Sequence, residues 1–116
     1  MARLLTDKGL AQFGDSLINF AYSIAITKTS GRPKGSKVPD KVLAEAAVKA
    51  GLRKFLPRRI SRGEIANSVE ALLGRSWLDQ LVNLDEIVSF LSDESYMIPS
   101  ENFARLAETV LERLRV

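Results

Sequence analysis

The segment from Leu10 to Ile26, LAQFGDSLINFAYSIAI, limits the possible folds most, because its apolar residues recur at helical spacing and leave little of it to face water. We predict a helix whose buried stripe consists of Leu10, Phe13, Leu17, Ala21 and Ile24, widened by Ala11, Ile18 and Tyr22. Such a helix needs other helices packed around it.

One acidic residue, Asp15, lies within the wider apolar arc, between Ala11 and Ile18. An ionised carboxylate there needs a hydrogen bond, a counter-charge or a metal ion, because burying it alone costs several kcal/mol. Its neighbours Gly14 and Ser16 are small enough for another helix or a ligand to come close. The alternative is that Asp15 lies at the surface or bonds the local backbone.

The residue types that are absent narrow the chemistry. The 116 residues include no cysteine and no histidine, which excludes disulfides, thiolate or imidazole metal sites and histidine-based triads. Any hydrolytic chemistry must therefore use carboxylates, with Mg²⁺ or Mn²⁺ as the expected cofactor. The apolar fraction of 46% suits one globular domain. Because Asn19 and Ser23 interrupt the longest apolar run, we expect no membrane span and a cytosolic, cytoplasmic location.

Charge is distributed unevenly along the chain. Residues 28–62 carry eleven basic and two acidic side chains, whereas residues 63–116 carry four basic and ten acidic ones. A compact basic segment suggests an acidic partner, most often a phosphate backbone; the alternative is a solvated surface with pairing between the two halves. The candidate RNA-binding side chains are Lys28, Arg32, Lys34, Lys37, Arg53, Lys54, Arg58, Arg59 and Arg62.

Capping signals divide the chain into helices, and no stretch alternates with the period of a β-strand. The first helix is expected to follow an N-cap at Thr6 and to end near Thr27, before a flexible basic loop from Lys28 to Pro39. The second helix is expected over Lys41–Ala50, with Asp40 as N-cap and Gly51 as C′ residue, followed by a short helical turn over Leu52–Ile60. Two further helices are expected to start at the capping pairs Ser61 with Glu64 and Asn83 with Glu86. The last helix is expected to follow Pro99 and Ser100. The predicted fold is all-α, with five or six helices.

The helix that follows Ser61 carries a second polar pair. Its core stripe is expected to be Ile65, Val69, Leu72 and Leu73. Asn67 and Glu70, three residues apart, share a face turned away from that stripe. Trp77 and Phe55 are expected in the core rather than stacked on bases.

Two motifs resemble those of the ribonuclease III family. Residues 10–17, LAQFGDSL, resemble its signature helix, in which an acidic residue precedes F-L-G-D-A/S-V/L. Residues 67–74, NSVEALLG, together with Trp77-Leu78-Asp79, resemble its second motif, which is D-x-x-E-A-L-I-G followed by an aromatic residue, Leu and Asp. Residues 37–44 and 50–52 are similar to elements between them, so order and spacing agree over residues 8–82. The short chain resembles archaeal and Mini-ribonuclease III members that lack a separate double-stranded-RNA-binding domain.

The resemblance implies a homodimeric, Mg²⁺-dependent endonuclease domain that cuts double-stranded RNA in a valley lined by both subunits. Asp15 matches the signature aspartate and Glu70 the second-motif glutamate, both metal ligands in the family. Ala11 stands in place of the first-motif acid, and Asn67 replaces the second-motif aspartate but can still offer a carbonyl oxygen. Gln12 stands where larger members carry an apolar anchor for the dimer partner. The candidate catalytic residues are Asp15, Glu70 and Asn67.

Three hypotheses follow from these observations. The first is the nuclease. The second is a ribonuclease III fold that binds RNA or plays an architectural role, with catalysis weakened or lost through Ala11 and Asn67. The third is an unrelated basic helical interaction domain, whose phosphate affinity would depend on salt but not on duplex form. Asp40 matches an often acidic position of the family that would line the valley, although an N-cap needs no such role.

Overall fold

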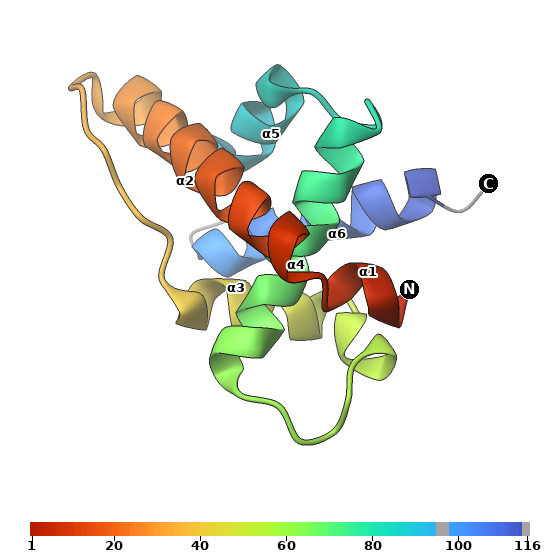
Figure 1. Ribbon diagram of the computed structural model, residues 1–116. Helices are drawn as coiled ribbons and strands as arrows, with labels where there is room; N and C mark the ends of the chain where they lie inside the picture. Colours follow the sequence, from red (N-terminus) through yellow and green to blue (C-terminus); the bar gives the residue numbers. More distant parts are fainter. Residues whose placement is uncertain (95–97, 115–116) are drawn as a thin grey trace.

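The computed structural model describes residues 1–94 and 98–114, which form helices joined by turns and one extended segment (Figure 1). The elements are α1 (Ala2–Leu5), α2 (Lys8–Ser30), α3 (Asp40–Lys49), the short 3-10 helix η1 (Leu52–Phe55), α4 (Arg62–Leu78), α5 (Leu84–Leu91) and α6 (Pro99–Leu114). The prediction of an all-α fold with five or six helices is confirmed, since the described residues form six α-helices and no strand. No helix among them is both long enough and apolar enough to cross a membrane.

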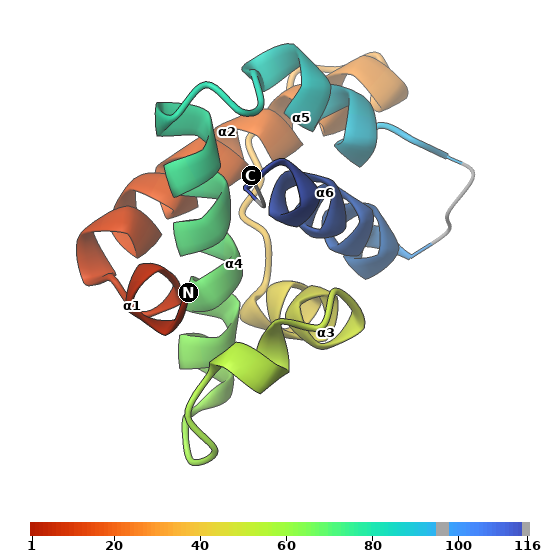
Figure 2. The same cartoon turned by 90° about the vertical axis from the view of Figure 1, so that its right-hand side faces the viewer.

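Helix α4 is the centre of the molecule and packs against α1, α2, α3 and α6. Figure 2 shows it between α1 on one side and α3 and α6 on the other. Residues 68–74 of α4 are all buried, including the polar Ser68 and Glu70. The Ser68 hydroxyl donates to the backbone oxygen of Ile65 at 2.5 Å, which satisfies it inside the helix.

Helices α2 and α4 cross where each carries a glycine. A Cβ atom added to Gly14 would lie 1.8 Å from the backbone oxygen of Glu70, and one added to Gly74 would lie 2.9 Å from that of Leu10. Two helices can approach this closely only where side chains are missing. The approach that the small size of Gly14 predicts is thus observed, and it brings the adjacent Asp15 to the buried Glu70.

The buried stripe of α2 differs from the predicted one. It consists of Ala11, Gly14, Ile18, Ala21 and Ala25. Because the helix backbones touch at Gly14, only small side chains fit along most of this contact, and Leu10, Leu17 and Ile24 lie half-buried at its edges.

Two aromatic residues that were expected to be buried lie at the surface instead. Phe13 and Trp77 are 37% and 38% exposed, and their ring centroids are 5.7 Å apart. Phe55, in contrast, is half-buried against the core, as predicted. On the last helix, Phe103, Leu106, Ala107 and Val110 recur at helical spacing and are all buried, while Leu114 is half-buried.

Three of the predicted helix-end signals are confirmed, whereas Pro99 and Ser100, expected before the last helix, are the first residues of α6. Ser61 with Glu64 and Asn83 with Glu86 both form capping boxes, and Gly51 adopts the left-handed φ of 78° that ends α3.

Three helix ends differ from the prediction. Asp7, not Thr6, caps α2 by accepting a hydrogen bond from the Leu10 amide at 2.9 Å, because Thr6 ends the short helix α1 that the sequence did not predict. Helix α2 continues to Ser30 rather than ending near Thr27. Asp40 is not the N-cap of α3, since Pro39 holds that position and Asp40 is the first helical residue.

Candidate functional site

Two acidic side chains from different helices meet at the crossing of α2 and α4. Asp15 and Glu70 line the same cavity, and Asp15 lies close enough to Glu70 to act on its carboxyl group. Glu70 is only 5% exposed, whereas Asp15 is half-buried and borders solvent. The two acids are 55 positions apart in the sequence, and the glycine contact at Gly14 brings them together.

The environment of Glu70 favours its neutral form. Burial, followed by the hydrogen bond and the negative charge of Asp15 and then the charge of Asp40, raises the pKa of Glu70 to about 8, while Lys37 acts in the opposite direction. Near neutral pH Glu70 therefore stays largely protonated.

Asn67 lies one helical turn before Glu70 and bonds it directly. With its amide nitrogen turned toward Glu70, it donates to Glu70 Oε1 at 3.0 Å and to the backbone oxygen of Gly63 at 3.1 Å. Asn67 and Glu70 are thus presented together, as predicted. The face that they share is not entirely open to solvent, because Glu70 is buried where α4 meets α2, whereas Asn67 is exposed.

An open cavity of about 420 Å³ lies over the carboxyl pair. It is lined by Lys8, Ala11, Gln12, Asp15, Lys37, Asp40, Asn67 and Glu70. Asp40, which the sequence indicated mainly as a cap, therefore borders the site, and Lys8 is a cation that the sequence analysis did not single out. Gln12 is exposed and faces this cavity as well.

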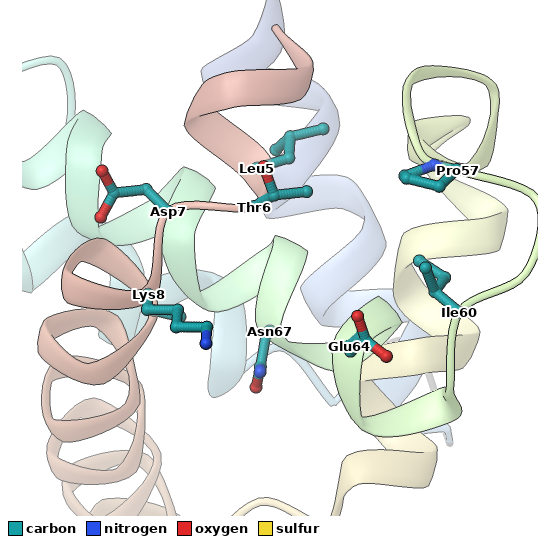
Figure 3. A pocket seen from close by; sticks show the side chains of 9 residues that line it. Leu5, Thr6, Asp7, Lys8, Pro57, Ile60, Glu64 and Asn67 are labelled. Atoms are coloured by element: carbon teal, nitrogen blue, oxygen red, sulfur yellow. The ribbon is translucent and has the colours of Figure 1, made fainter.

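A smaller pocket of about 110 Å³ adjoins this cavity, sharing Lys8, Ala11 and Asn67 with it. Figure 3 shows its walls, formed by the turn between α1 and α2, the segment with Pro57 and Ile60, and the start of α4. Glu64 and Asp7 also line it, but each accepts hydrogen bonds as a helix cap. Ala11 leaves open a space that a longer acidic side chain would enter.

The segment before α3 is held against α2 by side chains spaced four residues apart. Asn19 Oδ1 accepts from the Val38 amide at 2.8 Å, and Ser23 Oγ accepts from the Ser36 amide at 2.8 Å. Thr27 Oγ1 accepts from the Lys34 amide at 3.0 Å. We call these three contacts the loop ladder. They give the segment a fixed register on α2, where the sequence predicted a flexible loop, and they place Lys37 at the cavity.

The predicted RNA-binding residues fall into two groups. Lys28, Arg32, Lys34 and Lys37 lie exposed at the end of α2 and along the extended segment. In the second group, Lys54, Arg58, Arg59 and Arg62 are also exposed, and Arg62 lines a separate groove with residues of α3.

Two members of the second group have structural contacts. The Arg53 guanidinium donates to the backbone oxygens of Pro57 and Arg58, both at 2.6 Å. Lys54 Nζ lies 5.1 Å from the centre of the Phe55 ring. Of the nine predicted residues, Lys37 is the one that also lines the cavity over the carboxyl pair.

The donor set of the site fits a hard divalent cation. Two neighbouring carboxyl groups offer oxygen ligands, and a cation can replace the proton of Glu70. Asp15 and Glu70 would hold the ion, and Asn67 has an amide oxygen to offer. Among the described residues, no group of three or more acidic side chains could hold a metal ion. The site would therefore leave several coordination positions to water and to a phosphate, as Mg²⁺ commonly does.

A family model described as Ribonuclease III matches residues 8–116. The match includes every residue that lines the cavity, and it extends the resemblance seen in the sequence through α5 and α6. None of the curated proteins compared with the chain matches it.

Proposed function

The chain belongs to the ribonuclease III family, and on that basis we propose that it is a metal-dependent endonuclease that hydrolyses phosphodiester bonds in double-stranded or structured RNA. The observation that carries the proposal is that Asp15 and Glu70 line one cavity together with two lysines, Lys8 and Lys37. Adjacent acidic and basic groups suit a site that must hold both a cation and a phosphate.

In this proposal Asp15 and Glu70 hold one Mg²⁺ or Mn²⁺ ion. Such an ion supplies Lewis acidity and positive charge for phosphodiester hydrolysis. Glu70 must lose its proton when it becomes a ligand, and Asn67 then keeps the carboxylate oriented through its hydrogen bond to Oε1. Lys8 and Lys37 attract the phosphate of the substrate into the cavity.

The basic side chains outside the cavity support a proposal for the substrate class. The exposed lysines and arginines are not part of any sequence motif that reads bases. The extended segment from Gly31 to Pro39 also has no aromatic residue on which a base could stack. Contacts to phosphates and to the shape of the duplex are the usual mode of recognition for A-form RNA. We therefore propose duplex or structured RNA as the substrate, without strong sequence preference.

We further propose that the protein acts as a homodimer. Phe13, Trp77 and Leu78, which we call the aromatic patch, are between 37% and 47% exposed on α2 and at the end of α4. Large apolar side chains that gather at the surface are typical of interfaces. The same two helices carry Asp15 and Glu70, so a partner bound at the patch would bring a second site to the same assembly.

The alternative is an RNA-binding protein of the same fold without catalysis. It is considered because Ala11 and Asn67 stand where the resemblance places acids in the family motifs, and each missing acid would weaken the attraction for a divalent cation.

Incubation of the purified protein with a labelled RNA duplex, its single strand and the matching DNA duplex, with and without Mg²⁺, tests the proposal. We expect cleavage of the RNA duplex alone, and only with the metal. Duplex binding without cleavage in Mg²⁺ or Mn²⁺ would instead support the binding protein. Salt-sensitive binding that is the same for all three nucleic acids would support an unrelated basic domain.

A further inference from the structure

Asn19 connects the candidate metal site to the basic segment. Its Nδ2 donates to Asp15 Oδ1 at 3.0 Å, and its Oδ1 accepts from the Val38 amide at 2.8 Å. Both functional ends of the amide are therefore used, one by the carboxylate and one by the backbone.

The orientation of this amide is determined by its partners. A backbone N–H can only donate, so the oxygen of Asn19 must face Val38 and the nitrogen must face Asp15. Asp15 Oδ1 consequently receives a hydrogen bond from Asn19, which restricts rotation of the Asp15 carboxyl group.

The Val38 end of the contact reaches two further cavity residues. Val38 is buried, directly follows Lys37 and precedes Asp40 by two positions. Lys37 and Asp40 both line the cavity and act on Glu70 through their charges. One side chain thus joins the helix that carries Asp15 to the segment that carries Lys37 and Asp40.

We propose that Asn19 is a positioning residue of the candidate site: it orients Asp15 for the divalent cation and holds the basic segment in the register that places Lys37 in the cavity. This inference rests on the proposed function. Hydrogen-bond partners of metal-binding side chains commonly change metal affinity or activity by about 10- to 100-fold when they are removed.

The loop ladder supplies a matched control. Ser23 lies one turn beyond Asn19 on α2, and it both accepts from the Ser36 amide at 2.8 Å and donates to the Ser36 backbone oxygen at 3.1 Å. Ser23 therefore holds the same segment as Asn19 does. It makes two hydrogen bonds to this segment, whereas Asn19 makes one. None of its hydrogen bonds involves an acidic side chain of the site.

The test compares Asn19→Ala with Ser23→Ala in the full chain. Both variants lose contacts to the segment, so both should lower the melting temperature in EDTA. Only Asn19→Ala should raise the Mg²⁺ concentration for half-maximal cleavage, by about tenfold, and reduce kcat more than KM. Without RNA, the rise in melting temperature caused by a fixed Mg²⁺ concentration should be smaller for Asn19→Ala than for the wild type, and unchanged for Ser23→Ala.

A second variant at the same position keeps the test valid if Asn19→Ala does not fold. Asn19→Gln keeps the amide and most of the volume but displaces both ends, so it should fold and show an intermediate rise in the Mg²⁺ requirement. The inference is overturned if both Asn19 variants keep the wild-type response to Mg²⁺, or if Ser23→Ala changes it equally. If the wild type itself neither responds to Mg²⁺ nor cuts RNA, the proposed function fails instead, so the two failures are distinguishable.

Discussion

Glu70 is an acid that the fold buries against another acid, and the energetic consequence can be measured. In the unfolded chain its carboxyl group loses a proton near the ordinary value of 4.5, whereas in the folded protein the pKa is about 8. Between these values the folded state binds more protons than the unfolded state does. The free energy of unfolding in the absence of metal must therefore fall as the pH rises through this window, by at most about 1.4 kcal/mol per pH unit.

Replacement of Glu70 by glutamine should remove this loss of stability at high pH, because the amide resembles the protonated acid and can donate a hydrogen bond to Asp15. We expect Glu70→Gln to raise the free energy of unfolding in EDTA at pH 8 by a few kcal/mol, to flatten its pH dependence and to abolish cleavage. Urea denaturation between pH 5 and pH 9 measures the first two effects. A variant with the same slope as the wild type would show that Glu70 is not the titrating group.

Single residues were predicted from the sequence only where a local pattern revealed them. Asp15 stood out because an acid lies in an apolar arc, and Glu70 because it matches a family motif. The raised pKa of Glu70 could not be predicted, since it depends on burial beneath another helix. The position of Asn19, one helical turn after Asp15, is a weak indication that the two side chains could interact. Its hydrogen bond with the Val38 amide could not be predicted, because the sequence does not show the path of the segment before α3.

At the scale of elements, the crossing of α2 and α4 determines where the site forms. The contact at Gly14 is so close that a methyl group would overlap the backbone oxygen of Glu70 at 1.8 Å. No flexible side chain can move aside there, so the helices themselves would have to separate.

We predict that Gly14→Ala lowers the free energy of unfolding by about 3 kcal/mol or more, despite the better helix propensity of alanine. It should also weaken the Mg²⁺ response, because separating the helices draws Asp15 away from Glu70. Thermal unfolding followed by circular dichroism measures the stability change.

Gly35→Ala is the control, because no atom lies within 4 Å of a Cβ at that position in the extended segment. Its free energy of unfolding should stay within about 0.5 kcal/mol of the wild type. Equal effects of the two substitutions would show that the crossing is looser than described.

The positions of the helices were predictable because capping residues mark their ends, as Ser61 with Glu64 and Gly51 show. Which face of each helix is buried was harder to predict. Phe13 fits the apolar period of α2, but the small residues, not the large ones, mark the contact with α4. Apolar periodicity alone does not distinguish a side chain that packs within the chain from one left exposed for a partner.

At the scale of the whole molecule, the aromatic patch is an apolar surface that the fold of one chain does not cover. Trp77 and Phe13 pack on each other at the surface, and Leu78 beside Trp77 is 47% exposed. Exposed apolar area of this kind carries a solubility cost unless a partner covers it. A second copy of the chain would cover it in the proposed dimer.

We expect Leu78→Asp to convert the dimer to a monomer, because a carboxylate buried at the interface would lack a partner. Sedimentation equilibrium over a range of protein concentrations measures the association. Val48→Asp is the matched control, since Val48 is a 58% exposed apolar residue on α3 outside the patch. An unchanged association of Leu78→Asp, or dissociation of Val48→Asp, would place the interface elsewhere.

The central claim is that Asp15 and Glu70 form one cation site at which RNA is cut. The most direct test is cleavage of a labelled RNA duplex by Asp15→Asn in Mg²⁺, together with its binding to the same duplex in EDTA. Because asparagine preserves the shape but removes the charge, we predict no detectable cleavage and a duplex affinity equal to that of the wild type. Cleavage by Asp15→Asn at the wild-type rate would contradict the claim.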